Sequence, residues 1–254
     1  MPGLQVDHLS LRFGGLDALS DVSLEIPQDA LFAVIGPNGA GKTSFFNCVT
    51  GYYRATGGRI DFDGIDITRS GAPYLAGLGI RRTFQNIRLF SRLTALENVL
   101  AGAHLRSPSN IASVLLWTPG TRRRERELAD EALGWLAFVG LKERAGVRAA
   151  DLPYGMRKRV EIARAMMGRP RLLLLDEPAA GVSSVERENL SEVVRRIRDQ
   201  GVTVVLIEHD VELVMRLADE VAVLDHGRLI ARGAPAAVRN DPKVIEAYLG
   251  KRKR

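Results

Sequence analysis

The sequence predicts an α/β fold: a core with a parallel sheet around a phosphate-binding loop, an N-terminal antiparallel β-subdomain and an inserted α-helical subdomain. Three observations support this prediction. Residues 36–43 read Gly-Pro-Asn-Gly-Ala-Gly-Lys-Thr, a complete phosphate-loop pattern. Strand and helix patterns alternate after Pro170. Between these features, the stretch from about 92 to 168 is helical in pattern and punctuated by prolines.

The N-terminal part is expected to form antiparallel strands. Residues 4–13 and 22–26 alternate between apolar and polar side chains, with a Gly-Gly pair after the first segment. Downstream of the phosphate loop, an Asp-Gly pair separates residues 59–62 from 65–67, which is a strong hairpin signal. These four segments are predicted to belong to one small sheet.

The phosphate loop has the flanking structure that its chemistry needs. Residues 31–35 form a continuous apolar run typical of a buried strand, and residues 42–50 have the pattern of a helix closed by Gly51. Glycines let backbone N–H groups surround an anion, and the following helix directs its positive end at the same place. This context disfavours the alternative of a chance glycine turn before a helix. The expected nucleotide site comprises Gly36, Pro37, Asn38, Gly39, Ala40, Gly41, Lys42, Thr43 and Ser44.

The predicted helical subdomain spans about 92–168. It contains a capping box at Thr94–Glu97, opening a helix to about Ala103, and an amphipathic helix over 122–139. Four arginines crowd the start of the second helix, where they oppose the helix dipole, so they form either a solvated face or a partner contact. There is no internal repeat. We therefore expect a single domain over 1–254, with core and β-subdomain at about 1–91 and 169–254.

After Pro170 the parallel core resumes. Strands are predicted at 171–175, 202–207 and 221–224, with helices at 185–199 and 211–217 between them. The first strand ends in two carboxylates and the second in Glu-His-Asp. Because ligands bind at the carboxyl ends of parallel strands, these polar groups are expected at one edge of the sheet.

The residues at this edge suggest phosphoryl chemistry. Asp176 is the natural ligand of Mg²⁺, either direct or through water, once a phosphate loop is present. Glu177 could polarise a water that attacks the γ-phosphate, while His209 can hydrogen-bond the γ-phosphate or that water. Lys42 is expected to reach the β- and γ-phosphates, and the Thr43 hydroxyl to bind Mg²⁺. The alternative for the two carboxylates is that they cap the following helix.

The composition excludes several other classes of protein. The single Cys48 excludes a disulfide framework and a thiolate metal cluster, and it is expected to be a small core residue. The sequence lacks a signal-peptide pattern at its start and any apolar run near the ~20 residues that span a bilayer. The net charge of +6 includes the basic tail at 251–254, which suits an anionic membrane face, nucleic acid or simply a solvated terminus.

The order of motifs resembles the ATP-binding-cassette (ABC) ATPases, which are P-loop NTPases, from end to end. The phosphate loop is followed by Gln85 in Arg-Thr-Phe-Gln-Asn, a signature-like Leu-Pro-Tyr-Gly-Met at 152–156, Asp176-Glu177, and His209. The resemblance implies that Gln85 reaches Mg²⁺ and the attacking water, and that Phe13 stacks on adenine. It also implies that Tyr154 and Gly155 of the signature contact ATP held by a second ABC ATPase subunit, in a homodimer or heterodimer.

Three departures from the family pattern are visible: Pro153 and Met156 replace the usual Ser and Gln of the signature, and Ser183 stands where Asp is usual. The segments 82–90 and 240–250 look like the branched-chain amino-acid importer subgroup. We therefore expect a cytoplasmic ATPase subunit, peripheral on the inner face of the cell membrane, docked on separately encoded transmembrane permeases that an external solute-binding protein serves. The rival hypotheses are a soluble ABC-type ATPase acting on nucleic acid or ribosomes and a non-hydrolysing subunit.

Overall fold

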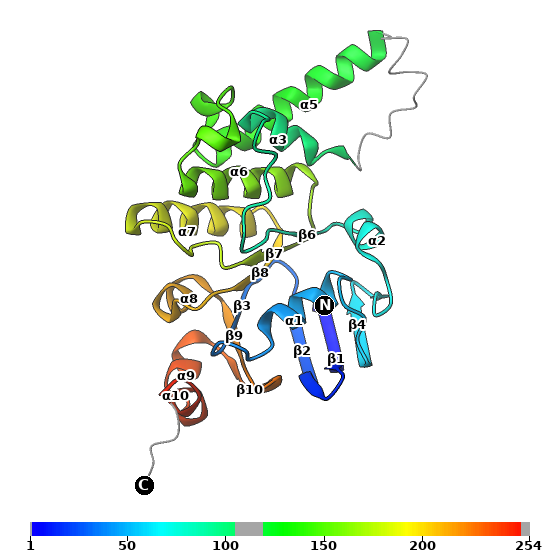
Figure 1. Ribbon diagram of the computed structural model, residues 1–254, viewed down its shortest axis with the longest axis vertical. Coiled ribbons are helices and arrows are strands. Elements are labelled where there is room, and N and C mark those ends of the chain that lie inside the picture. Colours follow the sequence, from blue (N-terminus) through cyan, green and yellow to red (C-terminus); the bar gives the residue numbers. More distant parts are fainter. Residues whose placement is uncertain (1, 105–118, 250–254) are drawn as a thin grey trace. The chain divides into compact units, whose positions relative to one another are not determined.

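The computed structural model describes residues 2–104 and 119–249 (Figure 1). The chain divides into two compact units. The first comprises residues 1–82, 171–178 and 194–254, and the second comprises residues 83–170 and 179–193. The second unit begins ahead of the expected helical insertion and takes in part of the segment that follows Glu177.

The first unit contains the predicted antiparallel sheet. Its strand order is β2-β1-β4-β5, and β1 pairs with both β2 and β4 (Figure 1). Side chains of β2 alternate between buried and exposed along its second half, as the sequence pattern requires. The strand β2 begins well before the predicted residue 22. The bounds are β1 Pro2–Phe13, β2 Leu16–Pro27, β4 Gly57–Phe62 and β5 Ile65–Asp66.

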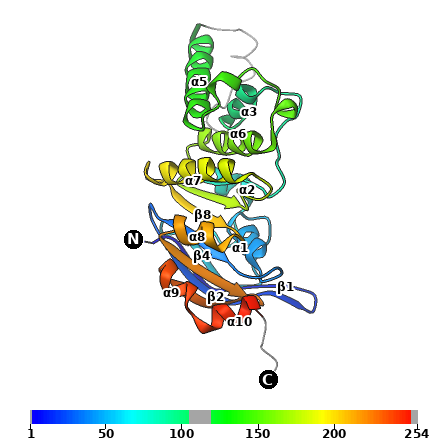
Figure 2. The same cartoon turned by 90° about the vertical axis from the view of Figure 1, so that its left-hand side faces the viewer.

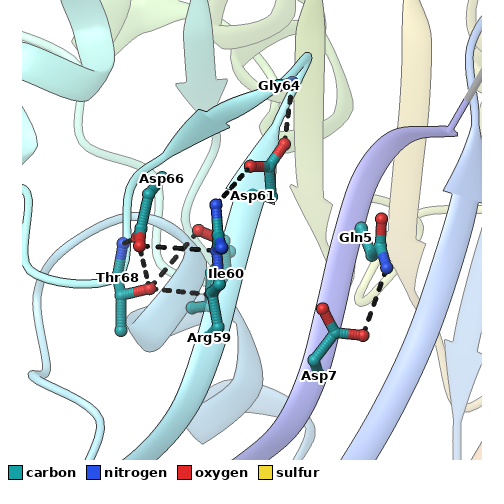
Figure 3. A network of polar contacts seen from close by, with 8 residues as sticks. All are labelled: Gln5, Asp7, Arg59, Ile60, Asp61, Gly64, Asp66 and Thr68. Atoms are coloured by element: carbon teal, nitrogen blue, oxygen red, sulfur yellow. Dashed lines mark hydrogen bonds and ion pairs between the residues drawn. The ribbon is translucent and has the colours of Figure 1, made fainter.

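The Asp-Gly hairpin between β4 and β5 is held by side-chain hydrogen bonds (Figure 3). Asp61 Oδ1 accepts from the Gly64 N–H at 2.7 Å, and Asp66 Oδ1 accepts from the Thr68 hydroxyl at 2.6 Å. Arg59 lies 3.3 Å from Asp61 and 3.4 Å from Asp66. Exposed ion pairs of this kind stabilise little, so the turn depends mainly on the Asp61 cap.

The predicted parallel sheet is also present in the first unit. Among the described residues it has six strands in the order β10-β9-β3-β8-β7-β6, of which only β10 is antiparallel to its neighbour. All residues of β3, β7 and β8 are buried, as continuous apolar strands should be. The strands are β3 Leu31–Ile35, β6 Ile80–Arg82, β7 Leu172–Asp176, β8 Thr203–Ile207, β9 Glu220–Asp225 and β10 Arg228–Gly233.

The core of the first unit joins buried faces of both sheets to helix α1. Cys48 of α1 is only 3% exposed and belongs to this core, and burial raises the pKa of its thiol to about 11. Helices α9 and α10 lie next to each other near the C-terminus (Figure 2). The helices of this unit are α1 Lys42–Val49, α2 Ala72–Gly77, α8 Val211–Leu217, α9 Pro235–Arg239 and α10 Pro242–Leu249.

The second unit is helical. Helices α3, α5 and α6 pack against one another (Figures 1 and 2). The capping box at the start of α3 is complete, with Thr94 and Glu97 bonded in both directions. The elements are α3 Ala95–Ala101, α5 Pro119–Phe138, the 3₁₀ turns η2 Lys142–Arg144 and η3 Ala149–Asp151, α6 Tyr154–Met167, and α7 Ser184–Arg198 as far as Val193.

The amphipathic pattern of α5 is visible in its burial. Ala132, Leu136 and the adjoining Val139 are at most 1% exposed. Of the four arginines near its start, Arg123, Arg124 and Arg126 are exposed, and Arg123 Nε lies 2.9 Å from Glu127; the side chain of Arg122 is outside the described residues. Among the described helices, none has the length and apolarity needed to span a bilayer.

Candidate functional site

The predicted site residues of the first unit follow neighbouring strands. In the parallel sheet, Ile207 at the end of β8 lies in register with Val34 of β3 on one side and with Asp176 of β7 on the other. The phosphate loop, the Glu177 carboxylate and His209 therefore leave the sheet at the same edge. This is the position where α/β folds bind their ligands.

The phosphate loop is shaped for an anion. Gly41, the N-cap of α1, has φ 101°, and a Cβ there would lie 2.6 Å from the Ala18 carbonyl oxygen, so glycine is needed. No side chain caps α1, which leaves its first N–H groups directed at the loop. Lys42 Nζ donates to the carbonyl oxygens of Gly36 at 2.6 Å and Pro37 at 2.9 Å. The ammonium group is thus held within the loop, where a phosphate chain would bind.

The charge state of Lys42 is coupled electrostatically to the carboxylates of Glu177 and Asp176. Burial lowers the pKa of Lys42, while the negative charges of Glu177 and Asp176 act in the opposite direction. The side chain of Lys42 is largely buried, and Thr43 beside it is exposed. The loop lysine and both strand-end carboxylates therefore share one charged environment.

Asp176 is buried and has a cationic partner that the sequence alone did not reveal. Its Oδ2 lies 2.6 Å from Arg82 Nη2, and both side chains are 6% exposed. Arg82 Nη1 also donates to Asn47 Oδ1 at 2.6 Å. A buried carboxylate requires a partner, and the sequence suggested a metal or a proton in that role. The arginine was missed because it lies on the short strand β6, which the sequence pattern did not predict.

Glu177 has an unusual backbone conformation. Its φ is 47°, which is uncommon for a residue with a side chain and is typical of functional sites, and its N–H donates to the Ile207 carbonyl at 2.9 Å. His209 Nδ1 lies 3.8 Å from Glu177 Oε2 and 3.9 Å from the buried Glu208. The structure thus brings Glu177 and His209 together, as the strand order predicts.

The alternative role for the carboxylates, as helix caps, is not supported. The helix that follows, α7, begins at Ser184. Its cap is a capping box in which Ser183 Oγ accepts from the Glu186 N–H at 3.3 Å and Glu186 Oε2 accepts from the Ser183 hydroxyl at 3.2 Å. Neither Asp176 nor Glu177 takes part in it. Asp210, in contrast, is a cap, because its Oδ1 accepts from the Leu213 N–H of α8 at 3.0 Å.

Phe13, the residue expected to stack on adenine, ends β1 and is 46% exposed. The ring of Tyr53 lies against it edge-on, with centroids 5.1 Å apart and an interplanar angle of 77°. One aromatic side chain therefore supports the other at the surface of the first unit.

The signature residues lie in the second unit. Tyr154 and Gly155 begin α6, whose N-cap is Pro153 without a side-chain cap. A Cβ on Gly155 would meet the carboxylate of Glu186, so a larger residue there would require that flexible side chain to shift. Tyr154 is 38% exposed, with the cationic groups of Arg157 and Lys158 within 5.8 Å of its ring. Gln85 also belongs to this unit, and its carbonyl accepts from Lys158 Nζ at 2.8 Å.

The donor set near the phosphate loop fits Mg²⁺ bound together with nucleotide. Within the described part of the chain, no three His, Cys, Asp or Glu side chains gather as a metal site. The exposed Thr43 hydroxyl and the Asp176 carboxylate are oxygen donors of the kind that Mg²⁺ prefers. Since Mg²⁺ usually takes one or two carboxylates and completes its shell with phosphates and water, these residues suffice once a nucleotide is bound.

Comparison with known proteins identifies the family. Residues 19–180 match the family described as ABC transporter. The chain belongs to this family. A second match, to the family described as branched-chain amino acid ATP-binding cassette transporter, covers residues 228–253. The resemblance that the motifs indicated is therefore confirmed.

Relatives align along nearly the full chain. The high-affinity branched-chain amino acid transport ATP-binding protein BraF of Pseudomonas aeruginosa is 46% identical, with 98% of each chain covered. The corresponding protein LivG of Escherichia coli is 44% identical over 98% of each chain, and a probable LivG of Archaeoglobus fulgidus is 36% identical over 97% of this chain and 95% of that one. The chain belongs among the ATP-binding subunits of the branched-chain amino acid transporter family.

Solved structures agree with the fold. The crystal structure of an ATP-binding cassette of an ABC transporter in its ADP conformation has a TM-score of 0.86 and 32% identity, covering 99% of this chain and 100% of that chain. A nucleotide-free ATP-binding cassette from an ABC transporter gives the same TM-score at 31% identity, with the same coverage. The predicted fold class is confirmed. The protein is an ABC transporter ATPase, which binds ATP and hydrolyses it for transport.

Proposed function

We propose that this ATPase powers a high-affinity importer for branched-chain or related amino acids. The support is the match of residues 228–253 and the full-length similarity to BraF and LivG, whose names assign them to branched-chain amino acid transport. In this proposal the chain works at the inner face of the cell membrane, docked on separately encoded permeases that receive solute from an external binding protein. It forms one ATPase domain, in which the second unit is the helical subdomain.

The first unit supplies the residues for hydrolysis. Lys42 exchanges its bonds to the loop carbonyls for the β- and γ-phosphates of ATP, and the helix start at Gly41 stabilises their negative charge. Thr43 and Asp176 of this unit would hold Mg²⁺, together with Gln85 of the second unit as the family resemblance implies, and the ion would neutralise charge on the phosphates. Glu177 accepts a proton from, or polarises, the attacking water, and His209 beside it orients that water or the γ-phosphate.

The second unit supplies contacts to a second ATPase subunit. Tyr154 and Gly155 begin α6, and their place at a helix N-terminus suits a phosphate held by the partner. Each nucleotide would then lie between the phosphate loop of one subunit and the signature of the other. A closed dimer that binds ATP better than ADP provides the two states that drive transport.

The observation that carries the catalytic assignment is Glu177, held in the left-handed region beside His209 at the ligand-binding edge of the sheet. The experiment compares Glu177→Gln with Glu25→Gln, an exposed control in the same unit. Glu177→Gln should retain ATP binding while hydrolysis falls by about a hundredfold or more, because the general base is lost. Wild-type turnover in Glu177→Gln would refute the role.

The cargo is tested separately with this ATPase reconstituted in liposomes together with its permeases and their binding protein. Leucine, isoleucine or valine outside the vesicle should stimulate ATP turnover. Stimulation by another class of solute alone would refute the assigned cargo and leave the ATPase assignment intact. The comparisons favour this proposal over a role on nucleic acid or ribosomes, because BraF and the LivG proteins have names that assign them to amino acid transport.

A further inference from the structure

One face of helix α6 binds the main chain of the segment that carries Gln85. Lys158 Nζ donates to the Gln85 carbonyl at 2.8 Å, Glu161 Oε1 accepts from the Arg88 N–H at 3.1 Å, and Arg164 Nη1 donates to the Arg88 carbonyl at 2.6 Å. The three side chains are spaced by three residues, which puts them on one side of the helix. The irregular backbone of 85–88 thus obtains its hydrogen bonds from α6.

Two of the three charged groups that make these bonds are removed from water, while Arg164 is partly exposed. Lys158 is 3% exposed and Glu161 is 2% exposed, and Glu161 Oε1 lies 3.5 Å from Arg164 Nη2. Burial raises the pKa of Glu161, while the N–H groups of Arg88 and Phe84 and the charges of Arg164 and Lys158 act in the opposite direction. Hydrogen bonds to charged groups in a dry environment are strong, so this contact is stiff.

The segment is further fixed at its ends. The Arg88 guanidinium lies 4.4 Å from the centre of the Phe84 ring. The fully buried Asn98 of α3 accepts from the Phe90 N–H at 2.8 Å and donates to the Phe90 carbonyl at 3.1 Å. From Phe84 to Phe90 the backbone therefore depends on helices of the second unit.

Immediately upstream, the chain is anchored in the first unit. Arg82 is bonded to Asp176 and Asn47, and the boundary between the two units falls after Arg82. Only Thr83 separates this anchor from Phe84, whose backbone N–H acts to lower the pKa of Glu161. The connection between the Asp176 anchor and the α6-bound segment is thus very short.

We propose that Glu161, with Lys158 and Arg164, makes residues 84–88 a rigid extension of α6, so that the position of Gln85 is set by the helix that begins with the signature. Glu161 is a positioning residue that acts through Gln85. This proposal rests on the role of Gln85 given under the proposed function.

The first test is amide hydrogen exchange at Arg88 in the full chain. Glu161→Ala removes the acceptor for this N–H, so exchange at Arg88 should be at least about tenfold faster than in the wild type. The control Glu143→Gln changes an exposed carboxylate of the same unit and should leave exchange unchanged. Glu161→Gln keeps an acceptor of the same shape and should give an intermediate rate. Wild-type exchange in Glu161→Ala would overturn the proposal.

The second test is a double-mutant cycle on ATP turnover. Glu161→Gln and Glu161→Ala should lower kcat, by about tenfold in Ala, with KM for ATP within about twofold of the wild type. If Glu161 acts through Gln85, adding Glu161→Ala to Gln85→Ala should cause no further loss. If the fold-losses in kcat of Glu161→Ala and Gln85→Ala multiplied in the double variant, the positioning role would be overturned. Wild-type turnover in Gln85→Ala alone would instead refute the role assigned to Gln85, while the exchange result would still decide whether the segment is held by α6.

Discussion

The buried ion pair between Arg82 and Asp176 predicts that replacing Arg82 will strongly lower the free energy of unfolding. The guanidinium of Arg82 lies 2.6 Å from Asp176 Oδ2 and 2.6 Å from Asn47 Oδ1, and the side chains of Arg82 and Asp176 are each 6% exposed. Arg82→Met keeps an apolar stem of similar length and removes the charge. It leaves the Asp176 carboxylate buried opposite a methyl group, in a site that water does not reach.

The size of the effect follows from this burial. Removing one partner of a buried ion pair costs about 3–5 kcal/mol, because the other charge stays desolvated and unpaired. A typical domain has only about 5–15 kcal/mol of stability, so the loss is a large share of the total. Arg82→Lys should recover only part of it, since one ammonium group does not reproduce the fork that bonds Asp176 and Asn47 together.

The assay is urea unfolding of the nucleotide-free protein, followed by far-UV circular dichroism. Arg82→Met should lower the free energy of unfolding by the amount given above, and the double variant Arg82→Met, Asp176→Asn should recover at least half of the loss, because no buried charge remains. As control, Arg59→Met removes an exposed arginine from its ion pairs and should change the midpoint little. A loss below about 1 kcal/mol in Arg82→Met would refute the reasoning.

Two further predictions concern local features. Thr94→Ala removes the side-chain half of the α3 capping box and should lower the free energy of unfolding by about 1 kcal/mol in the same urea assay, with Ser in its place restoring the wild-type value. Burial raises the pKa of Cys48 to about 11, so at pH 8 the thiol is protonated as well as shielded. It should react slowly with a disulfide reagent in the native protein and rapidly in denaturant, and rapid native reaction would contradict its place in the core.

The sequence predicted well those elements whose own residues show the pattern typical of a strand or a helix. Strand β3 is a run of five apolar residues, and α8 occupies the predicted residues. The short strand β6 was missed because two of its three residues are arginines. Arg82 can be buried there only because Asp176, far away in the sequence, neutralises it. The hydrophobic periodicity of the sequence carries no information about an ion pair between residues so far apart in the chain.

The start of the second unit differs from the prediction for the same reason. Residues 83–91 lack a helical pattern, so the sequence placed the helical insertion at about 92. In the structure this stretch joins the second unit, and side chains of α6, more than seventy residues away, hold its backbone. The sequence does contain Lys158, Glu161 and Arg164 at intervals of three, but an amphipathic pattern cannot distinguish buried charges from a solvated face.

The departures from the family pattern can now be related to local structure. Ser183, where Asp is usual, caps α7, and both Ser and Asp are favoured at this position, so the exchange preserves the start of the helix. Pro153 has no hydroxyl, yet its carbonyl accepts from the Arg157 N–H at 3.0 Å and α6 begins normally after it. Because no side chain caps α6, its first N–H groups are not occupied by the helix's own N-cap residue. In the proposed dimer, the absence of one hydroxyl would therefore remove a specific contact to the partner's nucleotide and would leave intact the attraction of the helix start for a phosphate.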